Sequence, residues 1–306
     1  MGLQYNILWV DDKKDDYQTL EIDKDLESYL KDRFFEPHIY MYETVEEAEA
    51  NIGNIKYDII FSDFNISENK NGKDFITDIR KQNINTEILF YTAQKNSLET
   101  GFDRISFLHL QSDTAYDDLK NKMKVVIDLT VEKLNVLTNL RGLVMSEVSE
   151  LDVMMKKLVA DYCKNNEENE KELRQYIIGK IEERVKKSLI TSNCESTCYH
   201  RWKDEEISSI IFKQNFDSHT TARALNHILE KKAELKIKNF FSEYNDEIIS
   251  NRNCLAHCQT KLNGNGIEIL VTNKGEKEFT SDDVRNIRKN IMKYHTLFVN
   301  LKGNIL

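Results

Sequence analysis

Hydrophobic and polar positions follow two alternating periods over the first 120 residues. Short apolar runs of strand length are separated by longer amphipathic stretches of helical period. The apolar runs are Ile7–Val10, Ile39–Tyr42, Ile59–Phe61, Ile88–Tyr91 and Ile105–Leu110. The helical stretches cover residues 15–33, 44–52, 72–82, 95–102 and 114 onward. This alternation predicts an α/β domain over residues 1–120, with a doubly wound five-stranded parallel sheet covered by helices on both faces.

The strand pattern ends near residue 114, and from Met123 to Leu158 apolar residues recur at spacings of three and four. This spacing predicts one long helix or two nearly collinear helices with a narrow apolar stripe. The stripe either packs on its own domain or forms a helix-to-helix seam between two copies of the chain. We assign residues 121–142 to a linking helix.

Residues 143–306 are predicted to form a second domain, an all-α helical bundle with a small β-hairpin. Helical periods cover residues 168–190, 204–213, 218–250 and 281–301. The β-like segments Ile267–Thr272 and Glu278–Thr280 flank a turn that contains Gly275, which is typical of a hairpin.

Composition and charge narrow the class of protein. The 306 residues include a single proline, Pro37, which favours long helices over a many-turned β-sandwich. The net charge of −9 is uneven, because residues 1–120 carry 13 Lys and Arg against 25 Asp and Glu, a net charge of −12. The rest of the chain carries +3. An acidic N-terminal part disfavours polyanion binding there, whereas the C-terminal part permits it.

No stretch approaches the roughly 20 apolar residues of a membrane span, and residues 1–10 lack the pattern of a signal peptide. We therefore expect a cytoplasmic protein with no membrane partner and with reduced cysteines. Two similarly spaced pairs, Cys194 with Cys198 and Cys254 with Cys258, leave two readings open: a structural zinc site or ordinary free thiols.

Polar residues follow three of the predicted strands. The first strand ends in Asp11 and Asp12, the third in Asp63 and the fourth in Thr92. Carboxyl ends of parallel strands meet at one edge, where three carboxylates would repel one another. Mg²⁺ prefers oxygen ligands, so a magnesium site is expected there, at which one carboxylate attacks a phosphoryl group. The Thr92 hydroxyl is placed to bond the new phosphoryl oxygens.

Four segments in order, ILWVDD, YDIIFSDFNI, Gly72 before a helix, and ILFYTA, resemble the receiver domain of two-component response regulators over about residues 3–125. The resemblance implies that Asp63 is the phospho-acceptor and Thr92 the switch hydroxyl. It also implies that Asp11 and Asp12, with Asp63 and the backbone carbonyl of Asn65, hold Mg²⁺.

One feature of that family is missing. Receivers normally carry a lysine at the end of the fifth strand, where this chain has His109, Leu110 and Gln111. Such a lysine pairs with the phosphoryl group as a point charge. Two readings stay open: a working phospho-acceptor, or a receiver fold used for docking or dimerisation without phosphorylation.

The C-terminal half contains the segment Ser250-Asn-Arg-Asn-Cys-Leu-Ala-His257. Arg252 and His257 are five residues apart, a spacing that allows both to reach one cavity at a helix end. A guanidinium can hold a phosphate and the charge that builds on it, and an imidazole can shuttle a proton near neutral pH. RNA supplies its own nucleophile, the 2′-hydroxyl, so this chemistry requires no metal.

This segment and its helical surroundings resemble the HEPN superfamily over about residues 143–302, with Asn253 as the polar residue after the arginine. The resemblance implies a metal-independent endoribonuclease whose cleft is shared by two protomers. Arg252 would bind and stabilise the scissile phosphate. His257 would be the acid and base, and Asn253 would orient or contact His257. Some members carry a tyrosine two residues after the histidine, where this chain has Gln259.

Together these features predict a response regulator whose effector cleaves RNA as a homodimer. A histidine kinase or another phosphodonor would be its partner, and phosphorylation of Asp63 would change the dimer geometry around RNA. The alternative is a non-catalytic signalling adaptor or RNA-binding module that uses both domains for association. A structural role for Arg252 and His257 as helix caps is a further reading.

Overall fold

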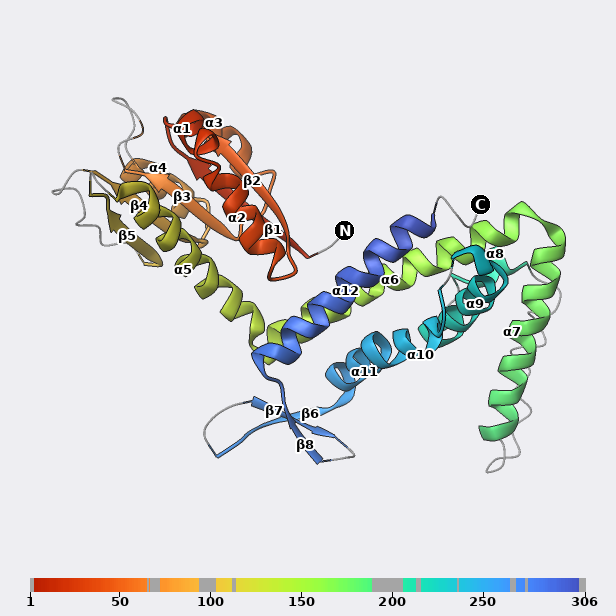
Figure 1. The fold of residues 1–306 in the computed structure, drawn as a ribbon. Helices are drawn as coiled ribbons and strands as arrows, with labels where there is room; N and C mark the ends of the chain where they lie inside the picture. Colours follow the sequence, from red (N-terminus) through yellow and green to blue (C-terminus); the bar gives the residue numbers. More distant parts are fainter. Residues whose placement is uncertain are drawn as a thin grey trace. The chain divides into compact units, whose positions relative to one another are not determined.

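The computed structural model of the chain (Figure 1) describes residues 3–64, 66, 72–93, 103–111, 114–188, 206–212, 216–235, 237–264, 268–272 and 275–302. The chain divides into two compact units, Gly2–Leu140 and Arg141–Leu306, each with its own core. Within the described residues, no helix combines the length and the apolar composition needed to cross a membrane.

The N-terminal unit is built on one parallel sheet in the order β2-β1-β3-β4-β5. Its strands are β1 (Gln4–Val10), β2 (Glu36–Tyr42), β3 (Ile59–Asp63), β4 (Glu87–Thr92) and β5 (Ile105–His109). The three central strands read as continuous apolar runs because both of their faces are covered. The doubly wound, flavodoxin-like sheet predicted from the alternating pattern is confirmed.

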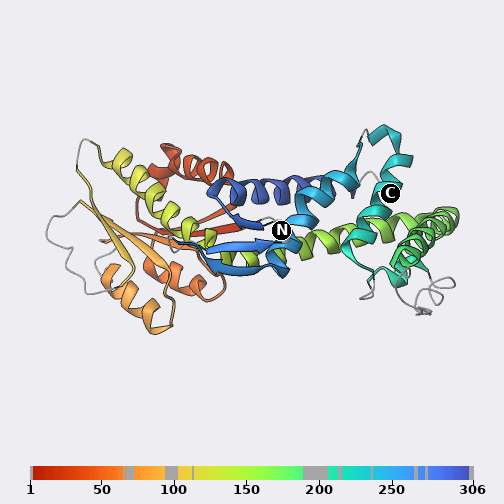
Figure 2. The ribbon, with the colours of Figure 1, turned by 90° about the horizontal axis from the view of Figure 1, so that it is seen from below.

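Helices cover both faces of this sheet (Figure 2). They are α1 (Lys14–Thr19), α2 (Ile22–Lys31), α3 (Val45–Ile52), α4 (Gly72–Lys81) and α5 (Ala115–Asn135). Because side chains alternate along a strand, Leu8 and Phe90 join one core cluster with residues of α3 and α4 such as Ala48 and Phe75. The helices α1, α2 and α5 lie on the opposite face.

The predicted helix over residues 15–33 is wrong in one respect, because it is two helices. The chain turns at Leu20, and Glu21 adopts a left-handed conformation with φ of 55° before α2 starts. Neither residue is a glycine or proline, so the sequence carries no local signal for the break. The stretch 95–102, also predicted as helical, lies outside the described residues.

Residues 121–142, predicted as a linking helix, divide between α5 and α6 (Leu137–Asn165). The two helices are separated at Val136, whose ψ of 133° is extended. The apolar stripe is buried within each unit: Met123 and Ile127 in α5, and Val148 and Met155 in α6, are at most 1% exposed. These residues pack on their own units, as the first of the two interpretations expects.

The C-terminal unit consists mainly of helices, as predicted. Besides α6 they are α7 (Glu167–Ser188), α8 (Ile207–Ile210), α9 (Ser218–Lys231), α10 (Phe240–Tyr244), α11 (Ser250–His257) and α12 (Ser281–Leu301). Aromatic rings join α10 to α12: Phe240 and Tyr244 lie 6.1 and 4.8 Å from the ring of Tyr294, and both contact Phe298. These edge and tilted contacts form the aromatic part of the core.

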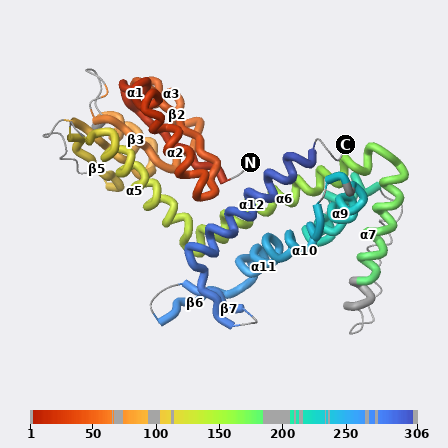
Figure 3. The backbone as a smooth tube through the Cα atoms, viewed as in Figure 1, coloured from red at the N-terminus to blue at the C-terminus, as the bar shows by residue number. Residues whose placement is uncertain are grey.

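The predicted helix over residues 218–250 is wrong, because α9 ends at Lys231 and a new helix begins after Asn239. Asn239 takes a left-handed φ of 56°, which marks the restart. From there α10, a π-helical turn (Asn245–Ile249) and α11 follow one another without a break (Figure 3). The Arg252–His257 segment therefore forms the last turns of a helix and ends with it.

The predicted hairpin is confirmed and extended by one strand. The strands β6 (Gln259–Leu262), β7 (Glu268–Thr272) and β8 (Gly275–Glu278) form an antiparallel sheet in the order β6-β7-β8. Gly275 has a φ of 117°, a conformation that side-chain-bearing residues rarely adopt. All four residues of β6 are exposed and mostly polar, so no alternating pattern revealed this strand.

We expect the substitution Thr280→Ala to destabilise the C-terminal unit by about 0.5–2 kcal/mol. The Thr280 hydroxyl accepts from the Asp283 amide at 3.2 Å, and the Asp283 carboxylate accepts from the Thr280 amide at 3.0 Å, which closes a capping box on α12. Urea unfolding followed by helical circular dichroism measures the change. Thr280→Ser, which keeps the hydroxyl, is the matched control, and equal loss in both variants would contradict this role.

Candidate functional site

Three carboxylates gather at the carboxyl ends of β1 and β3. Asp11 and Asp12 directly follow β1, and Asp63 is the last residue of β3. One oxygen from each lies within 4.8 Å of the others, and we call this group the acidic edge. In a sheet of this order the direction of winding switches between β1 and β3, which is where such folds bind ligands. The structure thus brings these three predicted residues together.

Asp11 is held by a network of aromatic hydroxyls. Its Oδ2 accepts from the Tyr17 hydroxyl at 2.8 Å and from the Tyr91 hydroxyl at 2.5 Å, and its Oδ1 accepts from the Lys13 amide at 2.8 Å. The Trp9 indole in turn donates to the Tyr91 hydroxyl at 2.7 Å. A carboxylate has about four acceptor positions, so Asp11 retains about one for a further ligand.

Burial governs the electrostatics of the acidic edge. Asp11 is 1% exposed, and this burial raises the pKa of its carboxyl, while the hydrogen bonds from Tyr91, Lys13 and Tyr17 act in the opposite direction. Burial also raises the pKa of Tyr91, which keeps its hydroxyl a neutral donor. A hard divalent cation would offset the repulsion among the carboxylates.

The donor set of the acidic edge fits such a cation. Asp12 is exposed and Asp63 is half-buried, so their carboxylate oxygens are the most accessible ligands. The buried Asp11 can supply one further oxygen ligand. All three are hard carboxylate oxygens of the kind that Mg²⁺ prefers. Asn65, whose carbonyl was predicted as a further ligand, lies outside the described residues.

Thr92 ends β4 beside the end of β5. It is fully buried, pairs in register with His109, and accepts a hydrogen bond at its carbonyl from the Leu110 amide at 2.8 Å. The described residues at this end of β5 are His109, Leu110 and Gln111, with no lysine among them. The His109 Nε2 is buried without a hydrogen-bond partner in the described part of the chain.

Arg252 is held inside the C-terminal unit. Its Nη2 donates to the Ser218 hydroxyl at 3.0 Å, and that hydroxyl also bonds the Asp152 carboxylate. Burial raises the pKa of Asp152, while the Ser218 bond and the Arg252 charge lower it. The guanidinium therefore links α11 to α9 and α6 through one polar network.

Asn253 and His257 point elsewhere. Both are exposed and line an open cavity of about 880 Å³ beside β7 and β8, which we call the α11 hollow. Arg252 is not among its lining residues. Five helical residues correspond to a rotation of about 140°, which separates the two side chains. Within one chain, Arg252 therefore does not line the α11 hollow that His257 lines.

The described residues contain one of the two cysteine pairs that the sequence suggested for a zinc site. Cys254 and Cys258 bring their sulfurs to 3.7 Å at the end of α11, and burial raises the pKa of Cys254. Cys194 and Cys198 lie outside the described residues. Among the described residues, the acidic edge is the sole cluster of three or more potential metal ligands.

Sequence reasoning missed the residues that support both sites. Trp9 lies on β1 and Asp11 follows the end of that strand, two residues later, so the strand alternation contained a signal for that network. Asp152 and Ser218 gave no signal, because they approach Arg252 from helices 100 and 34 residues away in the sequence.

No protein-family model matches the chain, and no curated protein matches it. Solved structures similar to it include the receiver domain of a Francisella response regulator, with 20% identity and a TM-score of 0.32 over 41% of this chain and 98% of that one. A Thermotoga maritima response regulator in complex with Mg²⁺ and BeF shares 23% identity, with a TM-score of 0.32 over 40% and 98%. A Vibrio cholerae chemotaxis protein shares 22% identity, with a TM-score of 0.31 over 40% and 98%. These scores are below 0.5, so the fold of the N-terminal unit is assigned from its own strand order.

We expect Tyr91→Phe to lower the free energy of unfolding of the N-terminal unit by about 1–3 kcal/mol. The change removes a buried donor from Asp11 and the acceptor of the Trp9 indole. Urea unfolding without divalent cations measures it. Tyr116→Phe, at a tyrosine that is 41% exposed, is the control and should change stability by less than about 0.5 kcal/mol. Equal stability of both variants would contradict the network's role.

Proposed function

We propose that the N-terminal unit is a response-regulator receiver in which Asp63 accepts a phosphoryl group with the help of Mg²⁺. The observation that carries this proposal is the acidic edge, with three carboxylate oxygens within 4.8 Å at the switch point of the sheet. Three of the four sequence segments that resemble receivers supply Asp11 and Asp12, Asp63, and Thr92. A histidine kinase or a small phosphodonor would supply the phosphoryl group.

The reaction uses the chain's own residues in distinct roles. A carboxylate oxygen of Asp63 attacks phosphorus, the bond from phosphorus to the donor's leaving group breaks, and the leaving group takes up a proton. A bound Mg²⁺ would neutralise charge on the transferred group. Asp12 and Asp63 would hold the ion, and Asp11 would add its one remaining acceptor position. Tyr17 and Tyr91 keep the Asp11 carboxylate in place.

Thr92 is the proposed switch residue of this unit. Its position at the end of β4, one residue after Tyr91, ties it to the strand that also braces Asp11. A hydroxyl there can donate to a phosphoryl oxygen and draw its loop inward. The described residues at the end of β5, His109 to Gln111, include no lysine, so in this chain the neutralising charge would come from the cation.

We expect the full chain to gain the mass of one phosphoryl group when incubated with acetyl phosphate and Mg²⁺, and Asp63→Asn to abolish the gain. Intact-protein mass spectrometry measures it. Asp15→Asn, at an exposed carboxylate on α1, is the matched control and should label like the wild type. Labelling that survives in Asp63→Asn would show that another residue is the acceptor, and no labelling of the wild type would leave this unit as a docking module.

As a second candidate, we propose that the C-terminal unit cleaves RNA without a metal when two copies associate. The observation that favours it is the exposed imidazole of His257 beside the exposed amide of Asn253 in the open α11 hollow, which Lys277 also lines. His257 would take the proton of the 2′-hydroxyl and return one to the leaving oxygen. Since Arg252 is engaged with Ser218 in the same chain, it would position α11 or serve the cleft of a second copy.

We expect cleavage of single-stranded RNA by the full chain in EDTA, with 2′,3′-cyclic phosphate ends, and a loss of at least about 100-fold in rate in His257→Ala. Gel electrophoresis of labelled RNA measures the rate. His295→Ala on α12 is the matched control and should cleave like the wild type. Equal cleavage by wild type and His257→Ala would remove His257 from the mechanism, and RNA binding without cleavage would favour the non-catalytic adaptor.

A further inference from the structure

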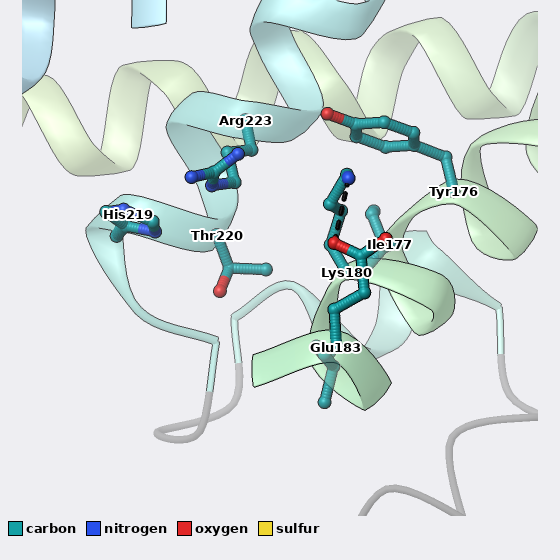
Figure 4. A pocket seen from close by; sticks show the side chains of 8 residues that line it. Tyr176, Ile177, Lys180, Glu183, His219, Thr220 and Arg223 are labelled. Carbon is teal, nitrogen blue, oxygen red and sulfur yellow. Dashed lines mark hydrogen bonds and ion pairs between the residues drawn. The ribbon is translucent and has the colours of Figure 1, made fainter. Parts of the chain in front are cut away.

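A second cavity of the C-terminal unit lies between α7 and α9, and we call it the α7–α9 pocket. It has a volume of about 200 Å³, smaller than the roughly 300–1,000 Å³ of pockets that enclose a drug-sized ligand. Figure 4 shows Tyr176 and Lys180 of α7 facing His219, Thr220 and Arg223 of α9 across it. The pocket is therefore built from two helices of one unit and suits a compact ligand.

The side chains that line the pocket are mostly hydrogen-bond donors. An ammonium, a guanidinium, two hydroxyls and an imidazole face one small space. Arg223 has no acidic partner among the described residues, although a guanidinium offers five donors. The single acidic residue of the lining, Glu183, contacts Lys180 at 3.0 Å. Charge and donor chemistry thus point to an anion with several acceptor oxygens.

The donors are held in place before any ligand arrives. The Arg223 guanidinium lies 4.1 Å from the centre of the Phe241 ring, and the His219 ring packs edge-on against the same phenylalanine at 4.8 Å. The Tyr176 ring stacks on His227 at 4.1 Å with an interplanar angle of 11°. Side chains fixed in this way lose less conformational entropy when a ligand binds, which favours specific binding over nonspecific surface contact.

We propose that the α7–α9 pocket binds a phosphate group carried by a small molecule, with inorganic phosphate as its simplest form. Arg223 provides the planar fork that matches phosphate oxygens, and Lys180 provides a second positive charge. The Tyr176 and Thr220 hydroxyls can donate to remaining oxygens. Glu183 contacts Lys180, so its carboxylate competes with the anion for that ammonium group.

The test is isothermal titration calorimetry of the full chain with inorganic phosphate, in EDTA so that no cation recruits phosphate to the acidic edge. We expect saturable binding with one site per chain. Arg223→Ala should weaken it about tenfold or more, because a charge-assisted hydrogen bond is lost. Glu183→Gln should strengthen it, because the competing negative charge is removed while the shape is kept.

Two controls separate a built site from general electrostatics. Lys157→Ala removes an exposed positive charge of α6 outside this pocket and should leave phosphate binding unchanged. Arg223→Lys keeps the charge without the fork and should bind with intermediate affinity, which also covers the case in which Arg223→Ala fails to fold. Absence of saturable phosphate binding, or equal weakening by Lys157→Ala and Arg223→Ala, would overturn the proposal. So would a site that binds short single-stranded RNA but no free phosphate.

Discussion

The carboxylates of Asp11, Asp12 and Asp63 repel one another, and the N-terminal unit must stabilise them at one edge of its sheet. Parallel strands bring their carboxyl ends to one edge, so residues distant in sequence must share a small volume there. Burial disfavours the charged form of Asp11, and the hydroxyls of Tyr17 and Tyr91 with the Lys13 amide offset part of this cost. The Trp9 indole completes this support from within the core. The hydrogen bonds from the two hydroxyls and the amide favour the charged form of Asp11, against the effect of its burial.

In the C-terminal unit, two arginines differ in whether other residues engage their positive charge. Arg252 donates to the Ser218 hydroxyl, which also bonds the half-buried Asp152, so this network joins three helices. Arg223 contacts an aromatic ring and forms no ion pair with the described residues, so its charge is available to a ligand. Two arginines of one unit thus have different roles, one structural and one in the proposed binding of a ligand. Their contacts, more than their residue type, determine these roles.

Much of the fold followed from periodicity, and the failures have physical causes. The central strands were predictable because burial on both faces demands continuous apolar runs, as in Ile88–Tyr91. The helix breaks at Glu21 and Asn239 were not, since both use a left-handed backbone without glycine or proline. The acidic edge could be predicted because strand ends converge by rule. The partners of Arg252 could not, because tertiary packing alone brings Asp152 and Ser218 to it.

The π-helical turn at Asn245–Ile249 has a consequence for how this segment can evolve. Such a turn accommodates one extra residue, and each residue rotates a helix by about 100°. The angular position of every side chain in α11 is therefore set by the length of the segment before it. Loss of a single codon there would restore a regular helix and swing Arg252 and His257 to new directions. Surface loops absorb insertions and deletions easily, whereas this stretch would be selected for constant length.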